Sequence, residues 1–322
     1  MPTLSAPGEP RASVFSSDSV TVHAPGTTSN VGPGFDCLGA AVSGMGDRVT
    51  ACRTAAEGVA VDRVSDPRIP QEPERNTAAL AAAAILRRGG CSGGMVLSIE
   101  KGLPLAGGLG GSAASAVGGA VAANALFGLG LPDEELLDAA LEAEAAVSGG
   151  RHADNVAPCL LGGAILVVAL DPLRLTRLEV HPSIRLALVT PRYSVETSRA
   201  RRVLPDSVRR LDAVGQAARL GGLLLGLERG DQGLVRQCLA DSIAEPARAP
   251  MYPGFPEARR AGLAAGALGV VVSGAGPTVL ALAPAGELSA VGEAVRGAYA
   301  RLGIEATAHL GQVDPQGARL LP

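Results

Sequence analysis

The sequence predicts an α+β protein with two domains, and three observations favour that class. A chain of 322 residues with 47% hydrophobic residues can fill one large core or two ordinary ones. Segments with strand alternation and segments with helical periodicity are mixed in both halves of the chain. The second half has a ferredoxin-like order, with strands expected at 184–189, 268–272, 279–283 and 304–310 and helices at 206–228, 231–243, 256–267 and 287–302.

We place the first domain at residues 19–180 and the second at 181–322, after a loose tail over residues 1–18 that lacks the features of a signal peptide. Asn76 can cap a helix, and Pro132 and Gly149 mark the start and end of another. Residues 25–36 are too rich in turn formers for a helix or a strand. The expected strands of the first domain are 19–24, 47–53, 58–62 and 95–100, together with a hairpin formed by 163–170 and 174–180. Three helices are expected: one that begins at residue 77, one at 113–127 and one at 132–148.

Composition excludes several classes of function. A formal net charge of −3 and only four Phe, three Tyr and no Trp argue against a nucleic-acid partner. The longest apolar run, residues 164–170, is far shorter than the roughly 20 residues of a membrane helix, so we expect no membrane partner. Five cysteines without a C-x-x-C pair are expected to be reduced thiols of a cytoplasmic protein. The oligomeric state, a homodimer included, stays open.

Residues 107–112, Gly-Gly-Leu-Gly-Gly-Ser, lie between an expected strand and an expected helix and can form a phosphate site. Bare backbone N–H groups in such a loop approach an anion closely, and the helix N-terminus adds about half a positive charge. A Walker A loop is absent, because the single lysine of the chain, Lys101, precedes the glycines, and the dinucleotide fingerprint is met only loosely. A tight turn without a ligand is the alternative. Lys101 either adds positive potential near the phosphates or survives by chance in an arginine-rich chain.

Helix 132–148 carries a carboxylate on its apolar side. With successive residues placed about 100° apart, Glu144 lies near the centre of the apolar stripe and Glu142 lies on the opposite face. A buried carboxylate is costly unless it is paired or binds a metal. Mg²⁺ typically takes one or two protein ligands together with phosphate oxygens, so Ser112 and Glu144 form a candidate ligand pair. An ion pair between Glu144 and an arginine is the alternative.

Other polar residues are weak candidates when each is taken alone. His152, Asp154 and Asn155 follow the glycine stop of helix 132–148, where they can face a cleft or serve as turn residues. Residues 273–278 form either a hairpin turn or a second glycine clamp. The charged residues Asp36, Arg201 and Arg248 suit a charged ligand, although a turn aspartate and solvated arginines are simple alternatives.

As a set, these motifs resemble the GHMP family of small-molecule kinases. The stretches that carry the resemblance are PGTTSNVGPGFD at 25–36, LPLAGGLGGSAAS at 103–115 and SGAGPT at 273–278, with HADNVAP at 152–158 and EPARAP at 245–250. The first motif is similar to the branch of the family that phosphorylates L-homoserine in threonine biosynthesis. The resemblance implies a first domain like domain 2 of ribosomal protein S5, a ferredoxin-like second domain, and an enzyme that uses ATP and Mg²⁺ to phosphorylate an alcohol.

The resemblance also implies a nucleotide site. Asn76 would contact adenine, and Ser112 and Glu144 would bind Mg²⁺. Gly274 and Gly276 lie in a loop that would brace the phosphate loop from the second domain. The other implied ATP-binding residues are Lys101, Pro104, Leu105, Ala106, Gly107, Gly108, Leu109, Gly110, Gly111, Ser112 and Ala113. Gly111 departs from the family pattern, which has a serine there, so any phosphate contact by two serines is in doubt.

The implied substrate site suits a zwitterionic amino acid. Asn30 and Asp36 would hold the ammonium of L-homoserine, and Arg201 and Arg248 its carboxylate, because guanidinium forks match carboxylates. His152 would line the site.

Asn155 would place the substrate hydroxyl and is, with Ser112 and Glu144, an expected catalytic residue. Phosphoryl transfer mainly requires positioning and charge stabilisation, so we expect no strong general base, with Asp154 as the rival hypothesis. Alternative functions are phosphorylation of another hydroxylated acid, a catalytically silent binding protein of the same fold, and a nicotinamide-dependent oxidoreductase.

Overall fold

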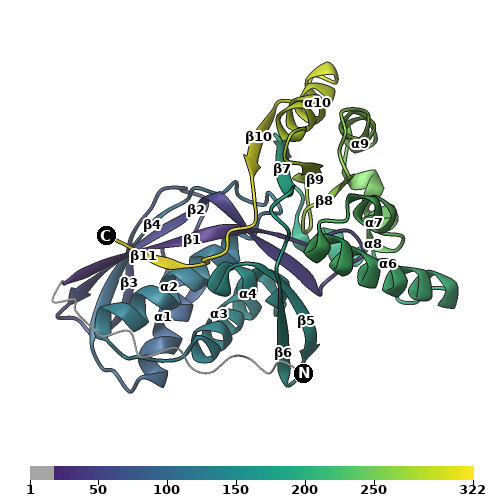
Figure 1. Ribbon diagram of the computed structural model, residues 1–322. Helices are drawn as coiled ribbons and strands as arrows, with labels where there is room; N and C mark the ends of the chain where they lie inside the picture. Colours follow the sequence, from purple (N-terminus) through teal and green to yellow (C-terminus); the bar gives the residue numbers. More distant parts are fainter. Residues whose placement is uncertain (1–17) are drawn as a thin grey trace.

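The computed structural model describes residues 18–322, which form two sheets with helices packed against them (Figure 1). The expected tail over residues 1–18 lies outside the described residues, apart from Asp18. Within the described part of the chain, no helix is long and apolar enough to cross a membrane.

The first sheet has seven strands, and the helices of the first domain cover one of its faces (Figure 1). Its main path is β11-β1-β2-β4-β3, and β5 pairs with β2 and with β6. The pairs are antiparallel except β3 with β4. The strands are β1 (Ser19–Ser29), β2 (Leu38–Thr54), β3 (Gly58–Val64), β4 (Gly94–Glu100), β5 (Ala164–Leu170), β6 (Leu173–Leu178) and β11 (Arg319–Leu321).

The helices of the first domain are α1 (Thr77–Arg88), α2 (Gly111–Phe127), α3 (Asp133–Ser148) and α4 (Ala153–Leu161), preceded by the 3₁₀ turn η1 (Pro73–Arg75). Asn76 caps α1 as predicted, because its Oδ1 accepts from the backbone N–H groups of Ala78 and Ala79. Small residues let α2 pack closely, since a Cβ on Gly119 would lie 2.1 Å from the Ala78 oxygen. This close packing places the first turn of α1 against the middle of α2.

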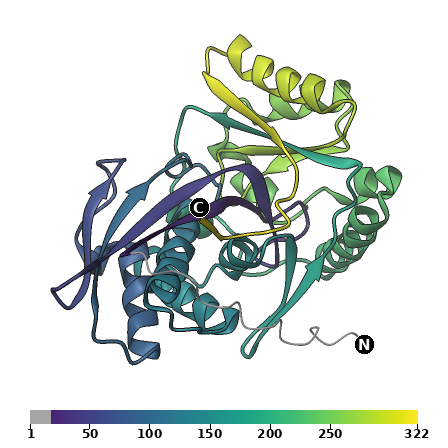
Figure 2. The same ribbon diagram turned by 60° about the vertical axis from the view of Figure 1, so that its left-hand side comes forward.

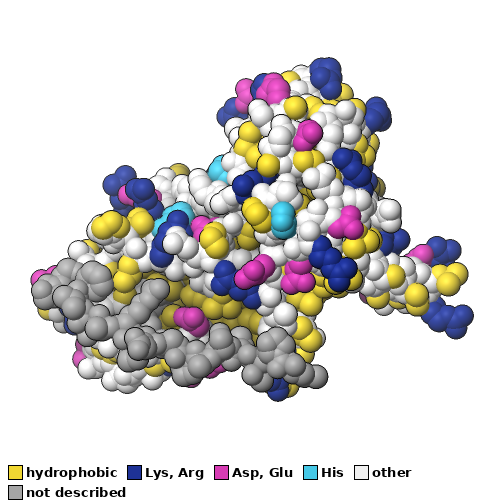
Figure 3. Space-filling view, in the orientation of Figure 1, with side chains coloured by type: hydrophobic (Ala, Val, Ile, Leu, Met, Phe, Trp, Pro, Cys, Tyr) yellow, Lys and Arg dark blue, Asp and Glu magenta, His cyan; other side chains and the backbone are white. Residues whose placement is uncertain are grey.

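The second sheet confirms the ferredoxin-like prediction. Its strands lie side by side in the order β10-β7-β9-β8, and all pairs are antiparallel. Numbered along this domain, that is the order four, one, three, two of a ferredoxin-like sheet. The elements are β7 (Ile184–Pro191), α5 (Thr197–Arg202), α6 (Arg210–Arg229), α7 (Gln232–Cys238), α8 (Ala244–Arg248), η2 (Ala249–Met251), α9 (Phe255–Ala264), β8 (Gly269–Val272), β9 (Val279–Pro284), α10 (Leu288–Arg301) and β10 (Ala306–Gly311). Helix α6 projects from this domain, and hydrophobic and basic side chains are visible on it (Figure 3).

Three local predictions were wrong. Residues 25–29 continue β1 instead of forming a loop, because a bulge between Pro25 and Gly26 lets the ladder continue past the proline. The HADN stretch begins α4 and does not form a turn, although His152, Asp154 and Asn155 do face a cavity, as one of the two alternatives predicted. The expected helix 231–243 ends at Cys238, and α8 starts separately at Ala244.

The end of the chain returns to the first sheet, which the sequence did not predict. Val313 forms a bridge with Val42 of β2, and β11 pairs with β1 through Thr21 and Leu321. Figure 2 shows this yellow segment crossing from the second domain to the first. Residues 319–321, which the sequence predicted as part of the second domain, thus add a strand to the first sheet.

Candidate active site

A cavity of about 320 Å³ is lined by residues of both domains and has the size of a small-molecule site. Leu109 and Gly276 do not line it: the Leu109 side chain is buried in the core, and Gly276 packs against the ring of Tyr252. The predicted site residues that line it are Asn30, Asp36, Asn76, Lys101, Pro104, Leu105, Ala106, Gly107, Gly108, Gly110, Gly111, Ser112, Ala113, Glu144, His152, Asn155, Arg201, Arg248 and Gly274.

The glycine loop enters α2 through backbone conformations that side chains disfavour. Gly108 and Gly110 have φ of 76° and 65°. A Cβ on Gly110 would lie 2.0 Å from Thr27 Oγ1, so the loop also needs glycine for space. The first helical bond of α2 runs from Ala114 N to Gly110 O, which leaves the N–H groups of residues 111–113 without intrahelical acceptors. These groups are suited to bind an anion.

The loop of residues 273–278 holds the glycine loop from the second domain, as predicted. Ser273 Oγ donates to Gly108 O at 2.7 Å, and Thr278 N donates to Gly107 O at 3.2 Å. Gly274 N also donates to Ser29 O at 2.9 Å. The two domains therefore meet directly at the candidate phosphate site.

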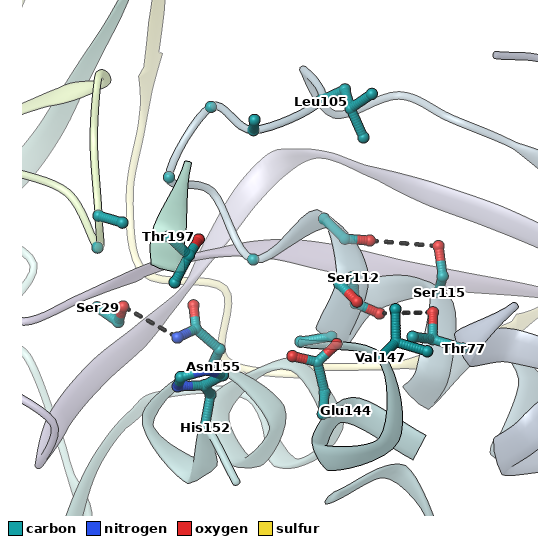
Figure 4. A pocket seen from close by; sticks show the side chains of 18 of the residues that line it. Ser29, Thr77, Leu105, Ser112, Ser115, Glu144, Val147, His152, Asn155 and Thr197 are labelled. Atoms are coloured by element: carbon teal, nitrogen blue, oxygen red, sulfur yellow. Dashed lines mark hydrogen bonds between the residues drawn. The ribbon is translucent and has the colours of Figure 1, made fainter. Parts of the chain in front are cut away.

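Glu144 points into the cavity from α3, toward the start of α2 that carries Ser112 (Figure 4). Its side chain is 3% exposed, whereas Glu142 is exposed and contacts Arg88 at 2.6 Å, so the prediction of an inward Glu144 is confirmed. Thr77 Oγ1 donates to Ser112 O at 3.3 Å, which ties the start of α2 to α1. A buried carboxylate and a serine hydroxyl that line the same cavity fit a hard cation that also binds phosphate oxygens.

Asp36 and Arg201, which also line the cavity, form a bidentate ion pair. The two bonds measure 2.9 Å and 3.0 Å, and Arg201 Nη2 also lies 3.1 Å from His152 Nδ1. Burial, and then the charge of Arg201, lower the pKa of His152, so its Nδ1 accepts from the guanidinium. Asn30 orients this loop, because its Oδ1 accepts from Asp36 N and its Nδ2 donates to Gly274 O.

Arg248 is a buried cation, with 5% of the residue exposed. Its Nε donates to Ala200 O at 2.9 Å, its Nη1 donates to Gly274 O at 3.3 Å, and its guanidinium lies 5.0 Å from the centre of the Phe35 ring. Burial lowers its pKa. Within residues 18–322 no carboxylate lies within ion-pair distance of it, although the charges of Asp36 and Asp241 act on it from farther away, so its guanidinium can still bind an anion in the cavity.

Asn155 is held in the cavity by strand β1. Its Oδ1 accepts from Thr27 Oγ1 at 2.9 Å, and its Nδ2 donates to Ser29 Oγ at 3.0 Å (Figure 4). Its neighbour Asp154 is 3% exposed, and burial, followed by the charge of Asp36, raises the pKa of Asp154 to about 7.

Sequence reasoning missed several residues of the cavity wall, including Ser29, Thr77 and Thr197. Single hydroxyl residues carry no local signal for a site.

Asn76 lines the cavity, but both ends of its side-chain amide already form hydrogen bonds within the protein: its Oδ1 caps α1, and its Nδ2 donates to Pro70 O at 2.8 Å. The ammonium of Lys101 forms an ion pair with buried Asp47, a counter-charge that the sequence did not reveal.

Comparisons with known proteins show the family of this chain. The family model of the GHMP kinases N terminal domain matches residues 76–163, and that of the GHMP kinases C terminal matches residues 223–301. The homoserine kinase of Pyrococcus abyssi is 39% identical over 285 residues, 88% of this chain and 94% of the relative. That of Xanthomonas campestris pv. campestris is 40% identical over 301 residues, 92% of each chain.

Solved structures give the same result. The crystal structure of homoserine kinase from Cytophaga hutchinsonii is 37% identical, covers 96% of this chain and 99% of its own, and has a TM-score of 0.93. The L. major mevalonate kinase, at 18% identity and a TM-score of 0.73, shows the same fold. This chain belongs to the GHMP kinase family. The relatives that match it at 37–40% identity over about nine-tenths of the chain are homoserine kinases.

Proposed function

We propose that this chain transfers the γ-phosphoryl group of ATP to the side-chain hydroxyl of L-homoserine, giving O-phospho-L-homoserine and ADP in threonine biosynthesis. One observation carries the proposal: the buried Arg248 and the Asp36–Arg201 pair lie in the same cavity as the glycine loop. Two cations and one anion complement an amino acid, which brings one carboxylate and one ammonium.

In this proposal the carboxylate of homoserine binds Arg248 and Arg201, and its ammonium binds Asp36. The substrate then exchanges the internal Asp36–Arg201 pair for two pairs with its own charges. Asn30 keeps Asp36 in place through the 2.8 Å bond to its backbone N–H, and His152 supports Arg201. A hydroxylated acid without an ammonium would leave Asp36 unmatched and should be a poor substrate.

At the nucleotide end, the N–H groups of residues 111–113 would bind the phosphates, and Ser112 and Glu144 would hold Mg²⁺. A bound metal would supply positive charge that offsets the charge of the phosphate oxygens. The Ser273 and Thr278 contacts keep the loop in place, so that the protein supplies mostly position and charge stabilisation.

Asn155 orients the substrate hydroxyl with an amide that is itself fixed by Thr27 and Ser29. An amide does not act as a base, so the hydroxyl passes its proton to the γ-phosphate or to water as the new bond forms. Asp154 is the competing base, since its pKa of about 7 lies near a neutral working pH.

A coupled assay that detects ADP tests the proposal directly. L-Homoserine with Mg·ATP should be turned over, and 4-hydroxybutanoate, which lacks the ammonium, should be turned over far more slowly. Turnover of 4-hydroxybutanoate at least as fast as homoserine would favour a kinase of another hydroxylated acid. No ADP with any hydroxyl substrate, despite nucleotide binding, would favour a silent relative.

We further propose a cytoplasmic location. All five cysteines are thiols in the structure, which is typical of a reducing compartment.

A further inference from the structure

A buried network lies behind the phosphate loop, centred on a residue outside the cavity wall. Asp47 of β2 is fully buried, and the side chain of Lys101, which follows β4, is 6% exposed. The ammonium donates to Asp47 Oδ2, to Gly111 O at 2.7 Å and to Ser115 Oγ at 2.8 Å. An ammonium has three protons, so each of them has an acceptor within the protein. We call these four residues the Asp47 network.

The network connects β2 to the first turn of α2. Asp47 Oδ1 accepts from Gly102 N at 3.1 Å, and its Oδ2 lies 3.2 Å from Ser115 Oγ. Gly111 and Ser115 are one helical turn apart at the start of α2. The lysine and the carboxylate therefore hold the turn whose N–H groups face the candidate phosphate site.

Charge decides which role Lys101 can have. A carboxylate in direct contact offsets the positive charge of the ammonium, so the pair adds much less potential to the cavity than a free lysine would. A phosphate that bound Lys101 directly would have to displace a buried anion, and the anion left behind would be costly. The arrangement therefore suits a structural link to α2 better than a phosphate ligand.

We infer that Asp47 is a positioning residue for phosphoryl transfer: through Lys101 and Ser115 it fixes the first turn of α2, so that the N–H groups of residues 111–113 point at the nucleotide. This inference rests on the proposed nucleotide site. It assigns Asp47 an effect on ATP use and none on homoserine binding, because the network has no contact with Asp36, Arg201 or Arg248.

A double-mutant cycle separates this role from a purely structural one. Asp47→Asn and Lys101→Met should each lower the urea midpoint of unfolding, because each leaves a buried charge without its partner. The double variant removes both charges and should regain much of that loss. Its KM for ATP or its kcat should nevertheless change by about tenfold to a hundredfold, the effect of a small displacement of a positioning element, while its KM for homoserine stays unchanged.

A control is the ion pair of buried Asp314 with the partly exposed Arg319, whose atoms lie 3.2 Å apart; neither residue lines the cavity. Asp314→Asn with Arg319→Met should alter stability and leave the KM for ATP unchanged. Ser115→Ala removes one acceptor without unpairing a charge, so it serves where the charge variants fail to fold. It should raise the KM for ATP several-fold.

The single lysine allows a test on the unaltered enzyme. After labelling with ¹⁵N-lysine, one Nζ resonance should be visible as a slowly exchanging ammonium, and it should keep its position when Mg·ADP binds. A large shift on binding would mean that Lys101 leaves Asp47 for the phosphates, and a rapidly exchanging signal would mean that the network is open; either result overturns the inference.

Unchanged ATP kinetics in the double variant, or equal losses for ATP and homoserine, would also overturn it. Failure of Mg·ADP to bind the unaltered enzyme in calorimetry would refute the proposed function and with it the positioning role. The ammonium resonance measured without nucleotide tells these two failures apart, because it reports the network alone.

Discussion

Replacing Arg248 by alanine should weaken homoserine binding strongly and change nucleotide binding little. Contacts with Ala200 O, Gly274 O and the Phe35 ring hold the guanidinium in place, and Arg248 is almost completely buried. Removing one partner of a buried charge pair costs about 2–5 kcal/mol. At about 1.4 kcal/mol per tenfold change, this corresponds to a roughly 30-fold to 4,000-fold rise in the dissociation constant of homoserine.

Arg201→Ala should have a smaller effect than Arg248→Ala. The Arg201 side chain is 42% exposed and is already paired with Asp36, so solvent and the carboxylate both reduce what its charge contributes to binding. Comparing the loss of homoserine affinity in the two variants therefore tests whether the burial of an arginine determines how strongly it binds the substrate carboxylate.

The assay is the KM for homoserine in the coupled reaction, with calorimetric binding of homoserine and of Mg·ADP. 3-Aminopropan-1-ol, which is homoserine without its carboxylate, should be used almost equally well by the wild type and by Arg248→Ala. Arg259→Ala is a matched control, because Arg259 also stacks on a phenylalanine, Phe255 at 4.6 Å, and donates to a backbone oxygen. Equal losses for homoserine and ADP, or the same loss with the amino alcohol, would show that Arg248 is structural.

Three further predictions concern the metal, the buried carboxylate and the loop. Ser112→Ala should raise the Mg²⁺ concentration needed for half-maximal activity, and an unchanged requirement would remove Ser112 from the metal site. Asp154→Asn should increase the free energy of unfolding by an amount that grows as pH rises from about 4 to about 7. The Asp154 carboxyl has its ordinary pKa of 3.8 in the unfolded chain and a pKa of about 7 in the folded protein, so its ionisation destabilises the fold in this pH range. Equal differences in urea midpoint between the variant and the wild type at pH 5 and at pH 8 would contradict this. A steep fall in kcat of the same variant, with binding intact, would instead make Asp154 the general base. Gly110→Ala should impair nucleotide binding, because its Cβ would lie 2.0 Å from Thr27 Oγ1 and the residue has a φ of 65°. Gly111→Ser should bind nucleotide normally, because no neighbour lies nearer than 3.7 Å to its Cβ. Similar nucleotide affinities for the two variants would refute the steric argument.

Much of the fold and part of the site could be predicted from local patterns. Capping by Asn76 and the inward position of Glu144 on α3 depend on residues close in the sequence, and the local periodicity of each segment predicted the succession of strands and helices from β7 to β10. The glycine loop before α2 is likewise a local signal, because its backbone conformation requires glycine at fixed positions. Helix periodicity alone distinguished Glu144 from Glu142.

Contacts between distant residues were decided only by the tertiary structure. Asp36 and Arg201, which pair across the cavity, are 165 residues apart, and Asp47 and Lys101 are 54 apart. Neither pair leaves a periodic trace in the chain, so the sequence showed a lone lysine but not the buried carboxylate that compensates it. The return of β11 to β1 escaped prediction for the same reason: a three-residue strand is too short to show alternation, and its partner lies at the other end of the chain.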